Sequence, residues 1–327
     1  MINYKSYNIL LTRKLPDLIE RELSEKYSTI QNKSDKPYSY KELKAKITNA
    51  DILVPCVSDT IDASIIRSAN NLKLIANFGN GVDNIDLITA KERNILVTNT
   101  PEVLTDDTSD LVITLILMLC RKVKSAEKKL HLGQWYGWGP SITNGERVLG
   151  KNLGIIGMGR IGRAVAIRAK SFGLKIHYHN RKQLNKSIEK DYCAKYWEDL
   201  NEMLKKMDII SIHCPYTPET FHLLSKRRLR LLKKTSIIIN TSRGEIIDEN
   251  ALAELLNSKK IHGAGLDVFE HEPQVTPKLL DAPNTVLLPH ISSATKEARH
   301  AMGLRVLKNI DEFTKNKKPK DLIRNFH

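Results

Sequence analysis

Three polar side chains follow apolar, strand-like runs in the C-terminal half of the sequence. They are Arg243, Glu272 and His290. Open α/β sheets bind ligands at the carboxyl ends of their parallel strands, so all three are candidates for chemistry at one sheet edge. An arginine binds a carboxylate bidentately, a histidine delivers a proton near neutral pH, and a neighbouring glutamate favours the protonated imidazole.

Such a trio is suited to the reduction of a 2-oxo acid. Arg243 would hold the carboxylate, His290 would protonate the carbonyl oxygen, and Glu272 would orient the histidine. A nicotinamide would supply the hydride. Spacing alone does not show that the three converge, and a single strand-end arginine or histidine is more often structural.

The sequence NLGIIGMGRIG places a glycine-rich turn between a strand and a helix. Gly157, Gly159 and Gly162 have the GxGxxG spacing, and the next strand follows at the distance expected of a βαβ unit. The glycines allow a tight turn, close approach of a pyrophosphate and close helix–strand packing, which predicts a dinucleotide site. The other residues of this predicted site are Met158, Arg160 and Ile161.

The strand after this motif ends in HNRK rather than in an acid. Asn180 lies 18 residues beyond Gly162, near the position where an acid binds the ribose 2′-hydroxyl. Asparagine removes the repulsion of a 2′-phosphate, and Arg181 and Lys182 add positive charge. Charged hydrogen bonds contribute about 1.5–3 kcal/mol each, so one or two would favour NADP(H) by roughly tenfold to several hundredfold. The alternative is that both cations are solvated loop charges.

Short apolar runs alternate with helical patterns along the chain, which predicts an α/β fold with parallel sheets. At 327 residues, two domains are expected. The expected strands are 8–13, 51–57, 72–78, 95–100, 152–157, 174–179, 208–214, 236–242, 263–269 and 285–290. The expected helices include 16–26, 62–69 and 295–314.

The segment between the two series of strands is predicted to be one long helix joining two domains. It spans 105–130, with aspartates clustered at its start and lysines at its end, as the helix dipole favours. The following segment, 131–150, is rich in glycine and tryptophan. A loop of this length is usually functional or an arm.

The composition is ordinary for a globular enzyme apart from a net charge of +15. The basic clusters at 225–234 and 315–320 carry no nucleic-acid-binding signature, which favours a lysine-rich surface. The longest apolar run, 111–120, is too short to cross a membrane, and the N-terminus lacks a signal-peptide pattern. Four scattered cysteines fit reduced thiols, so we expect a cytoplasmic protein without nucleic-acid or membrane partners.

Segments along nearly the whole chain resemble the D-isomer-specific 2-hydroxyacid dehydrogenase family. They are NFGNGVDNIDLITAKERNILVTNTPEVLTDDTSDL, GKNLGIIGMGRIGRAVAIRAKSFG, HCPYTPET, INTSRGEIIDE, GAGLDVFEHEP and LPHISSAT. Within the family, TPEVLTDDTSDL, WYGWGP and HNRK are most similar to NADPH-dependent glyoxylate/hydroxypyruvate reductases. The resemblance implies two Rossmann-like, flavodoxin-like domains: a nucleotide domain, 104–291, inserted into a substrate domain of 1–103 and 292–327. It also implies a homodimer, with 131–150 as the dimerisation arm.

The same resemblance implies roles for individual residues. Arg243, Glu272 and His290 would be the catalytic set in the cleft, with Asn80 and Gly81 offering backbone N–H groups to the substrate carboxylate. The other implied substrate residues are Val57, Ser293 and Trp138, the last reaching the partner's active site. The implied cofactor contacts are Cys214, Pro215, Thr220, Thr241, Ser242, Asp267 and Ser292.

Two residues depart from the family pattern. Asn80 stands where an apolar residue is more common, which bears on pocket polarity. Ser292 stands where glycine is usual, which bears on the local backbone and on cofactor contact.

We therefore expect an NADP(H)-preferring reductase of glyoxylate and hydroxypyruvate that forms D-2-hydroxy acids, with NAD(H) as the alternative cofactor. There are two competing hypotheses. One is a family member acting on a larger 2-oxo acid such as 2-ketogluconate, and the other is a dinucleotide-sensing interaction protein on the same fold.

His177 and His179 lie two apart on a strand without an evident third ligand, so no metal is expected. A redox role for Cys214 is disfavoured because nothing near it in sequence lowers its pKa.

Overall fold

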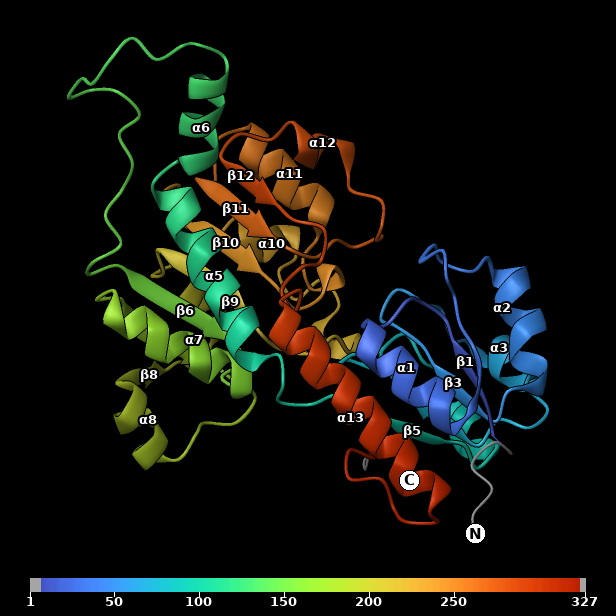
Figure 1. The fold of residues 1–327 in the computed structure, drawn as a ribbon. Coiled ribbons are helices and arrows are strands. Elements are labelled where there is room, and N and C mark those ends of the chain that lie inside the picture. Colours follow the sequence, from blue (N-terminus) through green and yellow to red (C-terminus); the bar gives the residue numbers. More distant parts are fainter. Residues whose placement is uncertain (1–6, 324–327) are drawn as a thin grey trace. The chain divides into compact units, whose positions relative to one another are not determined.

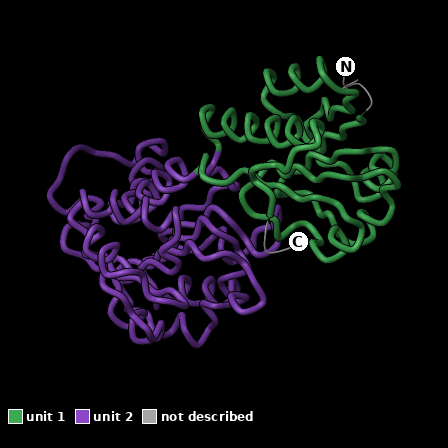
Figure 2. Tube along the Cα trace, turned by 90° about the horizontal axis from the view of Figure 1, so that it is seen from below, with its two compact units in different colours: residues 1–104, 294–327 green, residues 105–293 purple. Residues whose placement is uncertain are grey.

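The computed structural model describes residues 7–323 (Figure 1). The chain divides into two compact units, coloured separately in Figure 2. The first consists of residues 1–104 and 294–327, and the second of residues 105–293. The second unit is therefore inserted into the first along the chain.

The first unit is built on a five-stranded parallel sheet. Its strands, in the order β2-β1-β3-β4-β5, have the 2-1-3-4-5 arrangement of flavodoxin-like folds. The strands are β1 (Asn8–Leu11), β2 (Ser28–Ile30), β3 (Ile52–Val54), β4 (Leu74–Ala76) and β5 (Leu96–Thr98). The central strands β3 and β4 are apolar and buried at every position, as expected when helices cover both faces.

Helices cover both faces of this sheet. One apolar cluster lies beneath α2 (Tyr40–Lys46), the short 3₁₀ turn η2 (Ile47–Asn49), α3 (Ala63–Ser68) and α4 (Leu87–Glu92). The other cluster joins the sheet to α1 (Asp17–Lys26) and α13 (Lys296–Thr314). The helix α13 is held in this unit by Arg305, which bonds both Asp321 and Glu102. The C-terminal helix thus completes a core begun at the N-terminus.

The second unit is built on a seven-stranded parallel sheet. The order β12-β11-β10-β9-β6-β7-β8 is the doubly wound Rossmann arrangement with one additional strand. The strands are β6 (Asn152–Ile156), β7 (Lys175–His179), β8 (Ala194–Tyr196), β9 (Ile209–Ile212), β10 (Ile237–Asn240), β11 (Gly263–Leu266) and β12 (Thr285–Leu287). The predicted α/β class with two parallel sheets is confirmed.

Helices again cover both faces of the larger sheet (Figure 1). One face packs against α5 (Thr105–Cys120) and α7 (Arg160–Ser171). The other packs against α9 (Leu200–Leu204), α10 (Lys226–Leu229), α11 (Glu249–Asn257) and α12 (Pro277–Leu280). The remaining elements are α8 (Lys186–Tyr192), beside β8, and the 3₁₀ turns η3 (Pro218–Thr220) and η4 (Gly244–Ile246).

The prediction of one long helix over 105–130 is wrong. The chain forms α5 as far as Cys120 and resumes as α6 (Val123–His131), with Lys122 between them in the left-handed region at φ +52°. The carbonyl of Cys120 accepts a hydrogen bond from Glu146 N–H at 2.7 Å, where a continuous helix would supply its own donor. Glu146, from the segment 131–150, therefore supplies the donor that the next turn of a continuous helix would provide.

Candidate active site

The three predicted catalytic residues follow three neighbouring strands of the second unit. Arg243 follows β10, Glu272 follows β11, and His290 follows β12. These strands are adjacent and parallel, so their carboxyl ends share one edge of the sheet. The convergence that spacing alone left open is therefore provided by the strand order.

A hydrogen bond joins two of these side chains. His290 Nδ1 lies 2.8 Å from Glu272 Oε2, and the side chains are 25% and 35% exposed, respectively. Burial raises the pKa of Glu272, but the bond to His290, the N–H of Phe269 and the charge of Arg243 outweigh burial and lower it. The hydrogen bond to Glu272 occupies Nδ1 and orients the imidazole, so Nε2 is the remaining ring nitrogen.

A buried carboxylate fixes the backbone that carries the histidine. Asp267 has no solvent exposure, and its two oxygens accept the N–H groups of Ile291 at 2.7 Å and Ser292 at 2.8 Å. Its carbonyl accepts the N–H of His290. His290 adopts φ +55°, an uncommon left-handed conformation for a non-glycine residue, which these bonds stabilise. Asp267 was expected as a cofactor contact, and its positioning role was missed.

Ser292 shows that glycine is not required at its position. It is not among the residues with positive φ, and its backbone N–H and carbonyl are bonded to Asp267 and Thr108. The left-handed residue in this turn is His290 itself.

The loop carrying Arg243 packs directly on the loop carrying Glu272. A Cβ atom on Gly244 would lie 1.9 Å from the carbonyl carbon of Phe269, so only glycine allows this approach. The side-chain amide of Asn240 donates to the Arg243 carbonyl at 2.8 Å and holds the turn after β10. Gly244 was not predicted as a site residue. Its position directly after Arg243 was the available signal.

The three glycines of the predicted dinucleotide site have different environments. Gly157 adopts φ +97°, and a Cβ there would lie 2.5 Å from Cys214 N. A Cβ on Gly162 would lie 2.4 Å from the Gly157 carbonyl oxygen. A Cβ on Gly159 would meet no atom within 4 Å, and Gly159 is the N-cap of α7. Two glycines thus serve the fold, whereas the third leaves open space at a helix N-terminus, which fits a pyrophosphate.

The HNRK segment lies at the end of β7, beside this turn. Asn180 Oδ1 accepts the N–H of Met158 at 2.7 Å, so this side chain stabilises the glycine-rich loop. Arg181 and Lys182 are exposed. The pKa of Glu219, in the loop after β9, is lowered mainly by a hydrogen bond with the Thr217 hydroxyl. The positive charge of Arg181 also lowers this pKa, so Arg181 lies near that loop.

The loops after β9 and β10 contain the other expected cofactor contacts. Ser242 donates to the Cys214 carbonyl, and Thr220 donates to the Pro215 carbonyl at 2.8 Å. The hydroxyl of Thr241 is buried without a hydrogen-bond partner among the described residues, as expected of an atom that meets a ligand. Burial raises the pKa of the Cys214 thiol to about 11, so it stays protonated near neutral pH.

The remaining expected substrate residues are distributed over several segments. Val57, Asn80 and Gly81 belong to the first unit and are partly exposed. Ser293 is partly buried at the end of the second unit, and Trp138 is 89% exposed in the arm. Their roles stay predictions.

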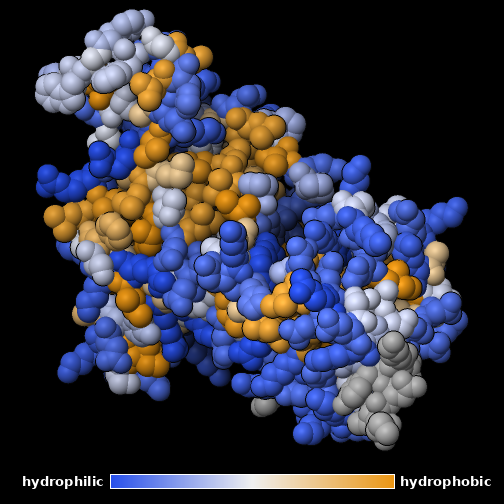
Figure 3. Space-filling model, in the orientation of Figure 1, coloured by the Kyte–Doolittle hydropathy of each residue, from blue (hydrophilic) through white to orange (hydrophobic). Residues whose placement is uncertain are grey.

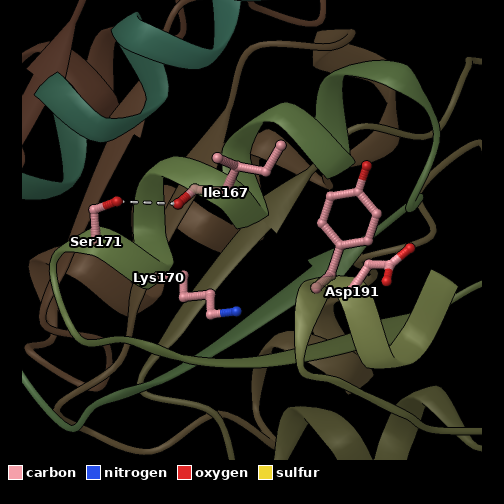
Figure 4. A pocket seen from close by; sticks show the side chains of 5 residues that line it. Ile167, Lys170, Ser171 and Asp191 are labelled. Carbon is pink, nitrogen blue, oxygen red and sulfur yellow. Dashed lines mark hydrogen bonds between the residues drawn. The ribbon is translucent and has the colours of Figure 1, made fainter. Parts of the chain in front are cut away.

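Two other features are not part of the predicted site. His177 accepts the indole N–H of Trp197, and His179 Nδ1 lies 2.9 Å from the Trp197 carbonyl, so both imidazoles have local partners. A cavity of about 290 Å³ lies between α7 and α8 (Figure 4). It is lined by Ile167, Lys170 and Ser171, from the end of α7 opposite Gly159, and by Asp191 and Tyr192 of α8.

Comparison with known proteins decides the family. Residues 113–292 match the model described as D-isomer specific 2-hydroxyacid dehydrogenase, NAD binding domain. The glyoxylate reductase of Thermococcus litoralis is 41% identical over 319 residues, which are 96% of each chain. The chain belongs to the D-isomer specific 2-hydroxyacid dehydrogenase family. As a dehydrogenase of this family it is an oxidoreductase acting on CH–OH donors, and its second unit contains the NAD-binding domain.

Solved structures of family members have the same fold. A glyoxylate reductase from Paecilomyes thermophila superposes with a TM-score of 0.86 at 31% identity, covering 98% of this chain and 99% of that one. An NADPH-dependent glyoxylate/hydroxypyruvate reductase from Sinorhizobium meliloti, in complex with NADP and malonate, gives 0.86 at 30% identity. That match covers 98% of this dehydrogenase and 97% of the other chain. Within residues 7–323, no helix has the length and apolar character needed to span a membrane.

The surroundings of Gly159 predict that a substitution there weakens cofactor binding without destabilising the fold. Gly159→Ala should change the free energy of unfolding by less than about 0.5 kcal/mol, because the new methyl group meets no protein atom. It should raise the Kd for NADPH or NADH about tenfold or more, because it fills the space for the pyrophosphate. Thermal unfolding without cofactor and titration of nicotinamide fluorescence measure the two effects.

The matched control is Gly162→Ala. This change should cost about 1–3 kcal/mol of stability even without cofactor, since its methyl group would overlap the Gly157 carbonyl. Normal cofactor affinity in Gly159→Ala would show that the dinucleotide binds elsewhere.

Proposed function

We propose that this dehydrogenase reduces glyoxylate and hydroxypyruvate to D-2-hydroxy acids, preferring NADPH. The observation that carries the proposal is the hydrogen bond of 2.8 Å between His290 Nδ1 and Glu272, at the sheet edge that also carries Arg243. The names of the relatives support the substrate class, since several curated relatives of 37–41% identity are glyoxylate reductases.

The proposed roles follow from the chemistry of the three side chains. The guanidinium of Arg243 binds the substrate carboxylate and orients the 2-oxo group. The imidazolium of His290 donates the proton on Nε2 to the carbonyl oxygen, because Nδ1 is bonded to Glu272. Glu272, with its lowered pKa, is ionised at neutral pH and stabilises the imidazolium. A bound nicotinamide supplies the hydride.

The preference for NADPH rests on the end of β7. An aspartate or glutamate at position 180 would repel a 2′-phosphate, whereas Asn180 uses its oxygen to hold Met158 and carries no charge. The exposed Arg181 and Lys182 are free to move onto an anion at little cost. The solved relative from Sinorhizobium meliloti was crystallised with NADP.

We also propose that the enzyme is a homodimer formed through the arm 131–150 and the helix before it. No residue of α6 is buried, and Tyr136 and Trp138 of the arm are 92% and 89% exposed. Figure 3 shows a broad apolar area on the same unit, directly below the arm in that view. Exposed apolar surface on this scale is typical of an interface, and a second copy of the chain is its proposed partner.

The proton-donor role is tested with two variants. His290→Ala should lower kcat for glyoxylate by roughly 10²–10⁴-fold while the Kd for NADPH stays within about twofold. Glu272→Gln should lower kcat less and move the alkaline limb of its pH profile to lower pH, because the imidazolium loses its counter-charge. Weak NADPH binding by His290→Ala, or an unmoved alkaline limb in Glu272→Gln, would argue against these roles.

The cofactor preference is tested at the end of β7. Replacing Arg181 and Lys182 by alanine should raise the Kd for NADPH at least about tenfold and leave the Kd for NADH nearly unchanged. Alanine at Lys170 and Lys175 is the control, since it removes the same charge near the opposite end of β7. Equal losses for both cofactors in the first variant would mean that these cations are surface charges.

The dimer is tested by removing the apolar arm side chains. Serine at Trp135, Tyr136 and Trp138 should reduce the mass measured by light scattering from twice the chain mass to 37.1 kDa. Ile88→Ser, at a 74% exposed position of the first unit, is the control and should remain dimeric. A monomeric wild-type protein, or a dimer that survives the triple substitution, would contradict the proposal.

A further inference from the structure

Three consecutive peptide carbonyls in the loop after β4 are bonded to side-chain amides. Asn77 Nδ2 donates to the carbonyls of Gly79 at 3.3 Å and Gly81 at 2.7 Å. Asn99 Nδ2 donates to the intervening carbonyl of Asn80 at 2.7 Å. All five contributing residues belong to the first unit, so the arrangement is complete within it.

The planarity of the peptide bond determines where the corresponding N–H groups point. In a trans peptide, the carbonyl of one residue and the N–H of the next point in opposite directions. The N–H groups of Asn80, Gly81 and Val82 therefore point away from the two amides. Within residues 7–323, no acceptor is bonded to any of these three N–H groups, and all three residues are partly exposed. Successive unpaired N–H groups of this kind form an anion-binding nest.

The loop has little freedom to turn these groups elsewhere. A Cβ atom on Gly79 would lie 2.5 Å from Val57 Cγ1, so the chain passes directly against that side chain. Thr100 N–H donates to the Gly79 carbonyl, and Asn77 N–H donates to the Thr98 carbonyl. Hydrogen bonds from both backbone and side-chain groups thus hold the loop against the residues that follow β4 and β5.

The environment of the Asn77 side chain is energetically unfavourable for an amide. Its side chain is fully buried, and its Oδ1 has no hydrogen-bond partner among the described residues. An unpaired buried acceptor costs about 1–3 kcal/mol, which an apolar residue of similar size would avoid. Only a donor, however, holds the carbonyls of Gly79 and Gly81 inward. This cost is explained if the loop must keep its N–H groups directed outward.

We infer that Asn77 and Asn99 are positioning residues for the substrate carboxylate, and that Val82 N–H is a third donor beside those of Asn80 and Gly81. The inference rests on the proposed function, the reduction of a 2-oxo acid, and on the carboxylate contact that the family resemblance implies for Asn80 and Gly81. The two amides act through the backbone and touch no substrate atom.

The experiment compares Asn77→Ala and Asn99→Ala with Asn32→Ala. Asn32 is an equally buried amide of the same unit, and its Nδ2 also donates to two carbonyls, those of Thr12 and Lys36. Steady-state kinetics with glyoxylate and NADPH, and inhibition by oxalate as a non-reducible carboxylate, are measured for each variant. Thermal unfolding shows how much stability each has lost.

The inference predicts a loss in carboxylate affinity alone. Asn77→Ala and Asn99→Ala should raise both the KM for glyoxylate and the Ki for oxalate about tenfold, with kcat within about threefold and the Kd for NADPH unchanged. Asn32→Ala should lose similar stability and keep a normal KM and Ki. Because Asn99 makes only one of the three bonds and is partly exposed, its variant supports the test should Asn77→Ala fail to fold.

The possible failures are distinguishable. Wild-type enzyme that reduces glyoxylate, with variants whose KM and Ki match those of Asn32→Ala, would overturn the positioning role alone. A loss confined to kcat would do the same. A wild-type protein that neither reduces glyoxylate nor binds oxalate would overturn the proposed function and, with it, this inference.

Discussion

The fully buried carboxylate of Asp267 is the constraint on which the arrangement of the candidate active site depends. Its two oxygens hold the N–H groups of Ile291 and Ser292, and this pair of bonds defines the turn that follows β12. Burial raises the pKa of Asp267 while the two N–H donors oppose that rise. The turn keeps His290 in its left-handed conformation, which is where the imidazole meets Glu272. A histidine on a mobile loop would have no fixed partner for Nδ1.

Close contacts between backbone segments fix the positions of the other loops at this sheet edge. Gly244 brings the loop of Arg243 against that of Glu272, as Gly162 brings α7 against the turn at Gly157. In both places glycine is needed because a backbone atom occupies the space of a Cβ.

The lowered pKa of Glu272 also has a consequence for stability. The interactions that lower the pKa of Glu272 stabilise the fold above the unfolded-state pKa of this carboxyl group, and their contribution is lost as pH falls through the folded-state value.

The sequence predicted most strands from their apolar residues, which form continuous runs where both faces are buried and alternate with polar residues in β7. It missed β2 and β8, which lie at sheet edges with partly exposed side chains and lack that pattern. The break at Lys122 was also missed, since it depends on Glu146, a residue distant in sequence. The candidate catalytic side chains were predicted from residue type and spacing, and their roles stay predictions. The supporting roles of Asp267 and Gly244 depend on contacts between loops, which no local pattern encodes.

The most direct test of the central claim is the stereochemistry of hydroxypyruvate reduction. Purified protein is incubated with hydroxypyruvate and NADPH, cofactor oxidation is followed by absorbance, and the glycerate formed is resolved by chiral chromatography. The proposed function predicts one D-glycerate for each NADPH oxidised. Formation of L-glycerate, or no oxidation of NADPH or NADH with either hydroxypyruvate or glyoxylate, would contradict it.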